Sequence, residues 1–252
     1  MSGNSTIRHA LSPAGVAARR PWIAAPWHTL SVLAILAGHS IYGAMVAPSS
    51  NAPSPASSGT GGSQVMSYIF MIGSEILLAT WIWAGVQWKG GRIRDLIGGR
   101  WSNWRQVLRD FAIALPFWVI WETTARLVYA LLYPHSSPSN AYHVPAGPAE
   151  IFLWLLVSLS AGFCEELVFR GYLQRQFHVA TGNVVVAVAL QAIVFGLVHT
   201  YQGWKPVLVI TVLGVLYGTL VALRRDLRSS MIAHAWSDIY EGYAKFLWIG
   251  RP

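Results

Sequence analysis

The sequence predicts an all-α, polytopic transmembrane helix bundle with a polar site inside the membrane, and three observations lead to that fold class. Of the 252 residues, 54% are hydrophobic and 11% are charged, whereas a soluble domain carries about a quarter charged residues. The mean hydropathy is +0.44, and apolar runs recur at lengths near the roughly 18 residues that cross a bilayer core. Several of the ten acidic residues nevertheless fall inside those runs, which predicts the polar site.

Seven apolar segments follow a basic lead, residues 1–26, that we expect to be flexible. The predicted spans are Trp27–Val46, Val65–Val86, Val107–Leu132, Glu150–Leu173, Val184–His199, Pro206–Leu223 and Met231–Trp248. Two Ser-, Pro- and Gly-rich connections, APSSNAPSPASSGTGGSQ and PHSSPSNAYHVPAGPAE, predict mobile external loops. Gly214 and Gly218 form a GxxxG pair that permits close helix packing. The chain is thus expected to divide into the lead, a group of spans in 27–148 and a helical core in 149–252.

The distribution of Lys and Arg orients the predicted bundle. These residues gather before the first span, after the second, at the end of the fourth and after the sixth, while the first and third loops carry none. The positive-inside rule then predicts a cytoplasmic N-terminus and an external C-terminus, in a multi-pass protein of the cell (inner) membrane. Despite the net charge of +8, the absence of a basic stripe with interleaved aromatics argues against a nucleic-acid partner.

Acidic residues inside the predicted spans each need a partner or a task, because a charge at the bilayer centre costs at least roughly 2.5–3.5 kcal/mol. Glu122 precedes Arg126 by one helical turn, which predicts an ion pair in helix packing. Glu241 has the same spacing to Lys245. Glu75 has no partner on its own helix, so it reaches the interface, faces the bundle interior or is protonated.

The stretch SAGFCEELVFRGYLQRQF carries two adjacent glutamates with different expected roles. Neighbouring helical residues point about 100° apart. Glu166 and Arg170 share a face at i, i+4 with the glutamate first, the favourable order for an ion pair. Glu165 has no such partner on its helix. An unpaired, desolvated carboxylate suits a general base that takes a proton from water.

Two later segments repeat the four-residue spacing. FGLVH places Phe195 and His199 on one face, which Gln191 extends by a turn, and HAWSD pairs His234 with Asp238. A lone histidine in a membrane helix is usually a packing or hydrogen-bonding residue. Together with the unpaired glutamate, however, these side chains predict a reactive set that binds zinc or positions a water for attack.

The depth of these residues predicts where the site lies. Glu165 and His199 are nearly equally far from the turn that joins their spans, so they are level in an antiparallel hairpin. His234 follows shortly after a cytoplasmic arginine cluster. The depths agree if the fourth and fifth spans project into the cytoplasm as far as RGYLQRQFHVATGN. We therefore expect the site a turn or two below the cytoplasmic surface, in a water-filled cavity that opens there.

The segments EELVFR, FGLVH and HAWSD, in this order on successive hydrophobic stretches, resemble the CPBP family. These are the CAAX-processing and bacteriocin-processing proteins, also called the ABI family of intramembrane proteases. Their pattern is E-E-x-x-x-R, then F-x-x-x-H, then H-x-x-x-N or D. The likeness covers about Trp154–Tyr240, and the first three spans carry no family-specific signal.

The resemblance implies that residues 149–252 form a CPBP-type catalytic helical core with endopeptidase activity within the membrane. Carried over residue by residue, Glu165 resembles the base that activates water, helped by His199. Glu166 and Arg170 resemble the pair that orients the site.

The resemblance also assigns His234 and Asp238 to the end of the site that holds the scissile carbonyl or a metal. Asparagine is commoner at the second position, and an amide donates to an oxyanion whereas an ionised aspartate does not. Asp238 is therefore protonated, ligates a metal or orients His234. A Zn²⁺ ion would be held by Glu165, His199 and His234. The resemblance leaves open a metalloprotease or a metal-free glutamate-type mechanism.

Three functional hypotheses follow. The first is an intramembrane endopeptidase that uses Glu-activated water on a membrane-associated or prenylated, CAAX-like peptide or protein. The second is a catalytically idle membrane adaptor or bacteriocin-immunity protein of the same fold. The third, a small transporter or proton channel, is disfavoured because no repeat of the span pattern is detectable.

Overall fold

A computed structural model describes residues 22–46, 61–134, 145 and 147–249, and every regular element in these ranges is helical. The α-helices are α1 (Pro26–Val46), α2 (Gly61–Trp88), α3 (Ile93–Ile97), α4 (Trp104–Leu132), α5 (Pro148–Glu165), α6 (Gln174–Thr181), α7 (Val184–Leu197), α8 (Trp204–Arg224) and α9 (Arg228–Ile249). A π-helical segment, η1 (Glu166–Leu173), joins α5 to α6, and a 3₁₀ turn, η2 (Thr200–Gln202), precedes α8. The all-α prediction is confirmed. The predicted flexible lead and the two predicted mobile loops lie largely outside the described residues.

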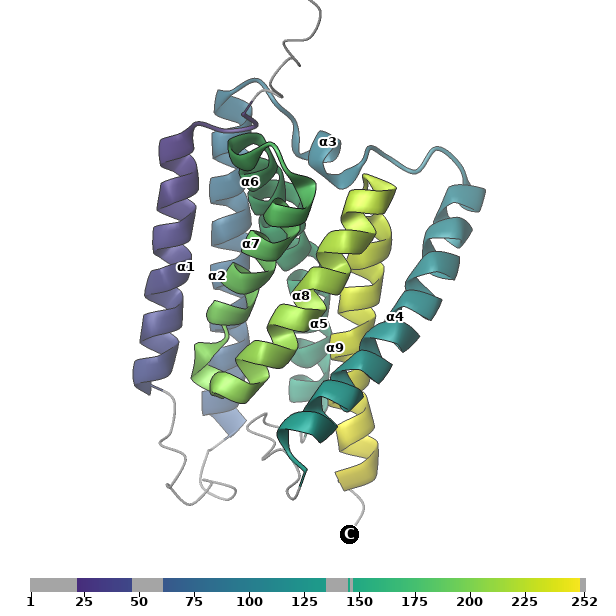
Figure 1. Ribbon diagram of the computed structural model, residues 1–252. Helices are drawn as coiled ribbons and strands as arrows, with labels where there is room; N and C mark the ends of the chain where they lie inside the picture. The colour runs from purple at the N-terminus through teal and green to yellow at the C-terminus, as the bar shows by residue number, and fades with distance from the viewer. Residues whose placement is uncertain (1–21, 47–60, 135–144, 146, 250–252) are drawn as a thin grey trace, which may run out of the picture.

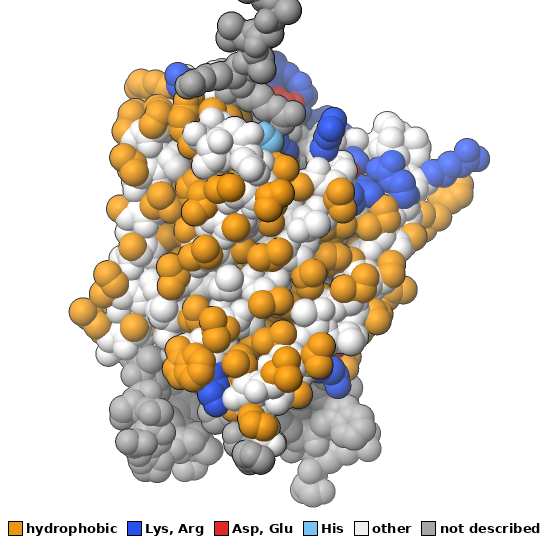
Figure 2. All heavy atoms as spheres, viewed as in Figure 1, with side chains coloured by type: hydrophobic (Ala, Val, Ile, Leu, Met, Phe, Trp, Pro, Cys, Tyr) orange, Lys and Arg blue, Asp and Glu red, His pale blue; other side chains and the backbone are white. Residues whose placement is uncertain are grey.

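The long helices run side by side in one bundle (Figure 1). Within the described ranges, four helices are long and apolar enough to cross a membrane: Gln64–Trp88, Trp104–Leu132, Pro148–Thr181 and Trp204–Arg224. These helices indicate a multi-pass membrane protein. Figure 2 shows a broad hydrophobic surface over the middle of the visible face, as a bilayer requires. Helices α1, α7 and α9 occupy the other three predicted spans, whose crossing of the membrane stays a prediction.

The predicted fourth span is longer than expected, because the helix does not end at Leu173. It continues through η1 and α6 to Thr181, a run of 34 residues. At 1.5 Å per residue such a helix measures about 51 Å, more than the roughly 30 Å of a bilayer core. Gly182 ends it with a positive φ of 70°, and the side chain of Asn183 then caps α7 by accepting from the backbone N–H groups of Val185 and Val186. This hairpin therefore extends well past one edge of an apolar core.

Close packing of α7 against α8 depends on the two glycines of the GxxxG pair. A Cβ atom on Gly214 would lie 3.0 Å from the Cα of Ala192, and one on Gly218 would lie 2.5 Å from the Nε2 of Gln191. Because the two glycines have no side chains, glutamine side chains of neighbouring helices reach their carbonyl groups. Gln191 Nε2 donates to the Gly214 carbonyl at 2.8 Å, and Gln174 Nε2 donates to the Gly218 carbonyl at 3.0 Å. The predicted close packing is confirmed. Gln191 thus serves helix packing, by a bond that the sequence did not indicate.

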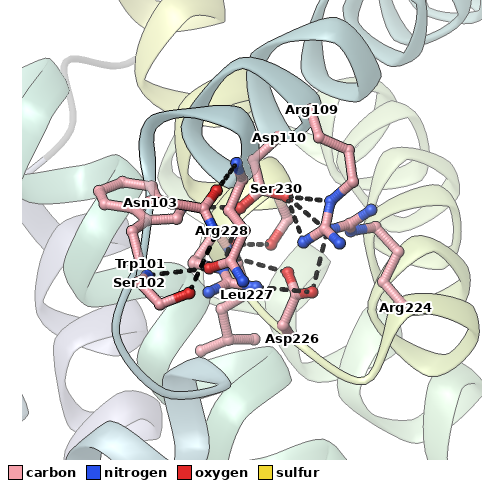
Figure 3. Close-up of polar contacts among 11 residues, drawn as sticks. Trp101, Ser102, Asn103, Arg109, Asp110, Arg224, Asp226, Leu227, Arg228 and Ser230 are labelled. Carbon is pink, nitrogen blue, oxygen red and sulfur yellow. Dashed lines mark hydrogen bonds and ion pairs between the residues drawn. The ribbon is translucent and has the colours of Figure 1, made fainter.

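A buried carboxylate, Asp110, ties α4 to the turn between α8 and α9 (Figure 3). Its side chain has no exposed surface, and its oxygens lie 2.6 Å from Arg224 Nη2 and 3.0 Å from Arg228 Nε. The indole of Trp101 donates to the same carboxylate at 2.7 Å. Asp226 lies 2.9 Å from Arg224 Nη2, so both arginines are shared between two acids. This ionic cluster closes the end of the bundle at which α3 also lies.

We predict that Asp110→Ala lowers the free energy of unfolding by about 3 kcal/mol, because it leaves two partly buried arginines short of counter-charge. Thermal unfolding of purified protein in a lipid or detergent environment measures this. The control is Asp95→Ala, since Asp95 forms an exposed pair with Arg94, and such a pair contributes at most about 1 kcal/mol. Equal unfolding of the two variants would contradict the role given to Asp110.

Candidate active site

The three sequence motifs meet at one cavity of about 160 Å³. Glu165 comes from the end of α5, His199 from the turn after α7, and His234 and Asp238 from successive turns of α9. Side chains of α4, α5 and α8 supply the apolar wall. Glu166 and Arg170 are not among the residues that line the cavity, and their side chains are fully buried. The structure thus brings together the residues that the sequence singled out from three separate helices.

The Glu166 carboxylate holds two side chains through a single oxygen. Its Oε1 accepts from Arg170 Nη1 at 2.8 Å and from His234 Nδ1 at 3.0 Å. A carboxylate can only accept, so the His234 ring carries a proton on Nδ1. The other ring nitrogen, Nε2, lies 3.8 Å from Glu165 Oε2 and 3.7 Å from Asp238 Oδ2. The predicted ion pair of Glu166 and Arg170 is confirmed, and it also fixes the orientation of His234.

Aromatic rings enclose the other side of the Arg170 guanidinium. Its Cζ atom lies 4.2 Å from the centroid of the Phe195 ring and 5.0 Å from that of Tyr217. A guanidinium over an aromatic face gains cation–π attraction, which is stronger away from water. Phe195 also meets the His199 ring edge-on at 5.1 Å. Phe195 therefore stabilises the Arg170 guanidinium of the buried ion pair. The sequence did not indicate this role, because it showed only that Phe195 lies one turn before His199.

The two charged residues of this pair lie on a π-helical turn. Segment η1 runs from Glu166 to Leu173, directly after Glu165. Such turns are rare and occur frequently at functional sites. Gly171 allows the segment to pack tightly, since a Cβ atom there would lie 2.9 Å from Leu227 Cδ1. Nothing in the residue spacing distinguishes this turn from an α-helix, so the sequence did not predict it.

His199 has its own orienting contact. Its Nδ1 lies 2.7 Å from the Phe195 carbonyl oxygen. A carbonyl only accepts, so Nδ1 carries the proton and Nε2 presents a lone pair. Because His199 lines the cavity that Glu165 also lines, this lone pair can accept from a water molecule there. Glu165 and His199 thus face the same cavity, as two residues at equal depth would.

Three acids of the predicted spans lie outside the motifs. Glu122 lies 2.6 Å from Arg126 Nη2, which confirms the predicted pair. Glu75 faces the bundle interior, where Ser160 of α5 donates to it. The predicted contact of Glu241 with Lys245 stays a prediction, because the structure does not describe the Lys245 side chain. The sequence had left the role of Glu75 open.

The predicted zinc ligands do not fit a metal ion as the structure has them. Among the described residues, no three His, Cys, Asp or Glu side chains form a group that could hold one. Of the three expected ligands, His234 and Glu165 approach each other to 3.8 Å.

The fold and this site define a multi-pass helical membrane protein with a polar Glu, His and Asp cluster between apolar helices. Residues 147–240 match the family model described as Rce1-like, Type II CAAX prenyl endopeptidase Rce1-like. The match covers every residue of the three motifs and confirms the resemblance that they predicted. No curated protein matches the chain, and no solved structure does.

We predict that Glu166→Ala lowers the free energy of unfolding by about 3–5 kcal/mol, because it leaves the Arg170 charge buried without its partner. Replacing both residues, as in Glu166→Ala with Arg170→Leu, removes that charge and should restore part of the loss. Thermal unfolding of the two single variants and the double variant measures the coupling. Glu122→Ala is the control, since 69% of the Arg126 side chain is exposed. Simple additivity of the two losses would contradict the prediction.

Proposed function

We propose that the protein is an intramembrane endopeptidase that hydrolyses a peptide bond with a water molecule activated by Glu165. One observation carries the proposal: Glu165, His199, His234 and Asp238 line a single cavity, and a hydrogen bond to Glu166 fixes the orientation of the His234 ring. The match of residues 147–240 to an endopeptidase family supports it.

The reaction begins when Glu165 takes a proton from a water molecule in the cavity. His199 accepts a hydrogen bond from the same water through Nε2, which is left with a lone pair by the contact of Nδ1 with Phe195. The water oxygen attacks the carbonyl carbon of the substrate and forms a tetrahedral oxyanion. When the C–N bond breaks, Glu165 returns the proton to the leaving amine, so the site ends as it began.

His234 serves the oxyanion in this scheme. Its Nδ1 is tied to Glu166, and in its doubly protonated form Nε2–H donates to the developing charge. Asp238, at 3.7 Å from Nε2, orients the ring and balances its charge. This role answers the question raised by an aspartate where asparagine is commoner. The indole of Trp154 donates to the Asp238 backbone carbonyl at 2.9 Å and so holds this turn of α9 in place.

The proposed topology has seven spans and a site that opens toward the cytoplasm of a cell (inner) membrane. Lys and Arg side chains gather mainly at the end of the bundle where α3 lies (Figure 2). The backbone N–H of Leu227, in the turn between α8 and α9, donates a hydrogen bond to the carbonyl of Ile97 in α3 at that same end. His234 lies fewer than two helical turns into α9, which begins at Arg228. Together with the positive-inside rule, these positions support a site near the cytoplasmic face.

The proposed substrate is a membrane-associated peptide or protein, including one with a prenylated, CAAX-like C-terminus. The apolar walls of the cavity favour an apolar substrate segment, and the family description names prenyl endopeptidases. A peptide that enters from the bilayer would reach Glu165 without crossing bulk water.

We predict that Glu165→Ala and His199→Ala each reduce cleavage at least about 100-fold, because each removes a group that acts on the attacking water. Purified protein in liposomes is assayed by mass spectrometry against membrane-anchored and prenylated peptides. Glu122→Ala, which removes an acid outside the cavity, should retain wild-type activity. A wild type that binds these peptides but cleaves none would favour the adaptor or immunity hypothesis. Full activity of Glu165→Ala would contradict the mechanism.

We predict that cleavage persists after exhaustive dialysis against EDTA, because the described side chains do not present three ligands to one ion. Metal content is measured in the same samples by atomic emission. Loss of activity on dialysis, restored by Zn²⁺ and not by Mg²⁺, would return Glu165, His199 and His234 to the role of metal ligands.

A further inference from the structure

Glu75 is a partly buried glutamate of α2 that faces the bundle interior. It belongs neither to the three motifs nor to the segment that matches the family model. It is the only charged residue of α2, which has 28 residues, and it lies far outside residues 147–240. An isoleucine or leucine, like the two residues that follow it in the sequence, would serve a packing role at lower cost. We therefore expect the Glu75 carboxylate to have a specific role.

A hydrogen bond from α5 fixes this carboxylate. The hydroxyl of Ser160 donates to Glu75 Oε2 and also to the Val157 carbonyl. Ser160 precedes Glu165 by five residues on the same continuous helix. The contact thus sets the position of the α2 carboxylate relative to the helix that carries the proposed base.

Glu75 lines both cavities that meet at the site. One is the cavity of about 160 Å³ that also contains His234 and Asp238. The other, of about 150 Å³, lies against α1, α2 and η1. The side chains of Glu75, Glu165 and His199 line both cavities. The two carboxylates therefore face the same space at the junction of the cavities, which is large enough for water.

We propose that Glu75 is a second catalytic carboxylate, which accepts a hydrogen bond from the attacking water while Glu165 takes its proton. This role rests on the proposed function. The water has two hydrogens: one is transferred to Glu165, and the other is shared in a three-centre hydrogen bond by Glu75 and His199 Nε2, which line the same cavities. With both directions fixed, the lone pair of its oxygen points at the substrate carbonyl. No atom is added to the reaction, since the second hydrogen stays on the new carboxyl group until it exchanges with solvent.

Orientation of this kind acts on the rate and not on substrate affinity, because a small misplacement of a reacting atom can cost about 100-fold. Ser160 acts through Glu75 as a positioning residue, so its loss should have a smaller effect of the same type. These expectations separate a catalytic Glu75 from one that only packs α2 against α5.

The experiment measures kcat and KM for Glu75→Gln, Ser160→Ala and Glu165→Ala in liposomes, with thermal unfolding of each. Glutamine keeps the size of Glu75 and an acceptor for Ser160, but it replaces the other oxygen with a donor. We expect kcat of Glu75→Gln to fall about 100-fold, with KM changed by less than about twofold and the melting temperature within about 2 °C of wild type. Ser160→Ala should lower kcat by about tenfold.

The matched control is Glu122→Gln, the same chemical change at an acid that pairs with Arg126 outside both cavities; its kcat should equal that of wild type. If Glu165→Ala is inactive while Glu75→Gln keeps wild-type kcat, the role of Glu75 is overturned and the proposed function stands. A melting temperature of Glu75→Gln that falls in step with kcat also overturns it, in favour of helix packing. A wild type that cleaves no peptide of the panel overturns both.

Discussion

One carboxylate oxygen, Oε1 of Glu166, connects the elements on which the site depends. It accepts from Arg170 within its own helix and from His234 on α9. The guanidinium of Arg170 in turn lies over Phe195 of α7 and Tyr217 of α8. Four helical segments are therefore held around one ion pair with no exposed side-chain surface. Removing either Glu166 or Arg170 leaves the other charge buried without its partner, so this pair constrains sequence and structure together.

Contacts within one helix could be predicted from the sequence, and contacts between helices could not. The spacing of Glu166 and Arg170 is a local property of the chain, as is the GxxxG pair that brings α8 against α7. The bond from His234 to Glu166 spans 68 positions, and that from Ser160 to Glu75 spans 85. A single sequence gives the periodicity of each helix but not which of its faces meets which neighbour.

The order of the motifs supplied part of what periodicity lacks. Three motifs on successive apolar stretches predicted that Glu165, His199 and His234 lie together, because the resemblance carried spatial information from the family. The resemblance begins near Trp154 and the family match at residue 147, so neither gave the α2 carboxylate a role. The π-helical turn was also missed, since the ion pair of Glu166 and Arg170 forms there as it would in an α-helix.

Adjacent glutamates have opposite surroundings here because a helix turns by about 100° per residue. Glu166 points into the closed side, where its charge is balanced by Arg170 and His234. The Glu165 side chain is 24% exposed and points into the cavities, where water can reach it. An apolar bilayer makes an unpaired charge costly on any other face. The cost of an unpaired charge in the membrane thus explains why the two acids differ. Glu165, which water can reach, is suited to remove a proton from it, whereas Glu166 pairs with Arg170 and His234 and holds the site in shape.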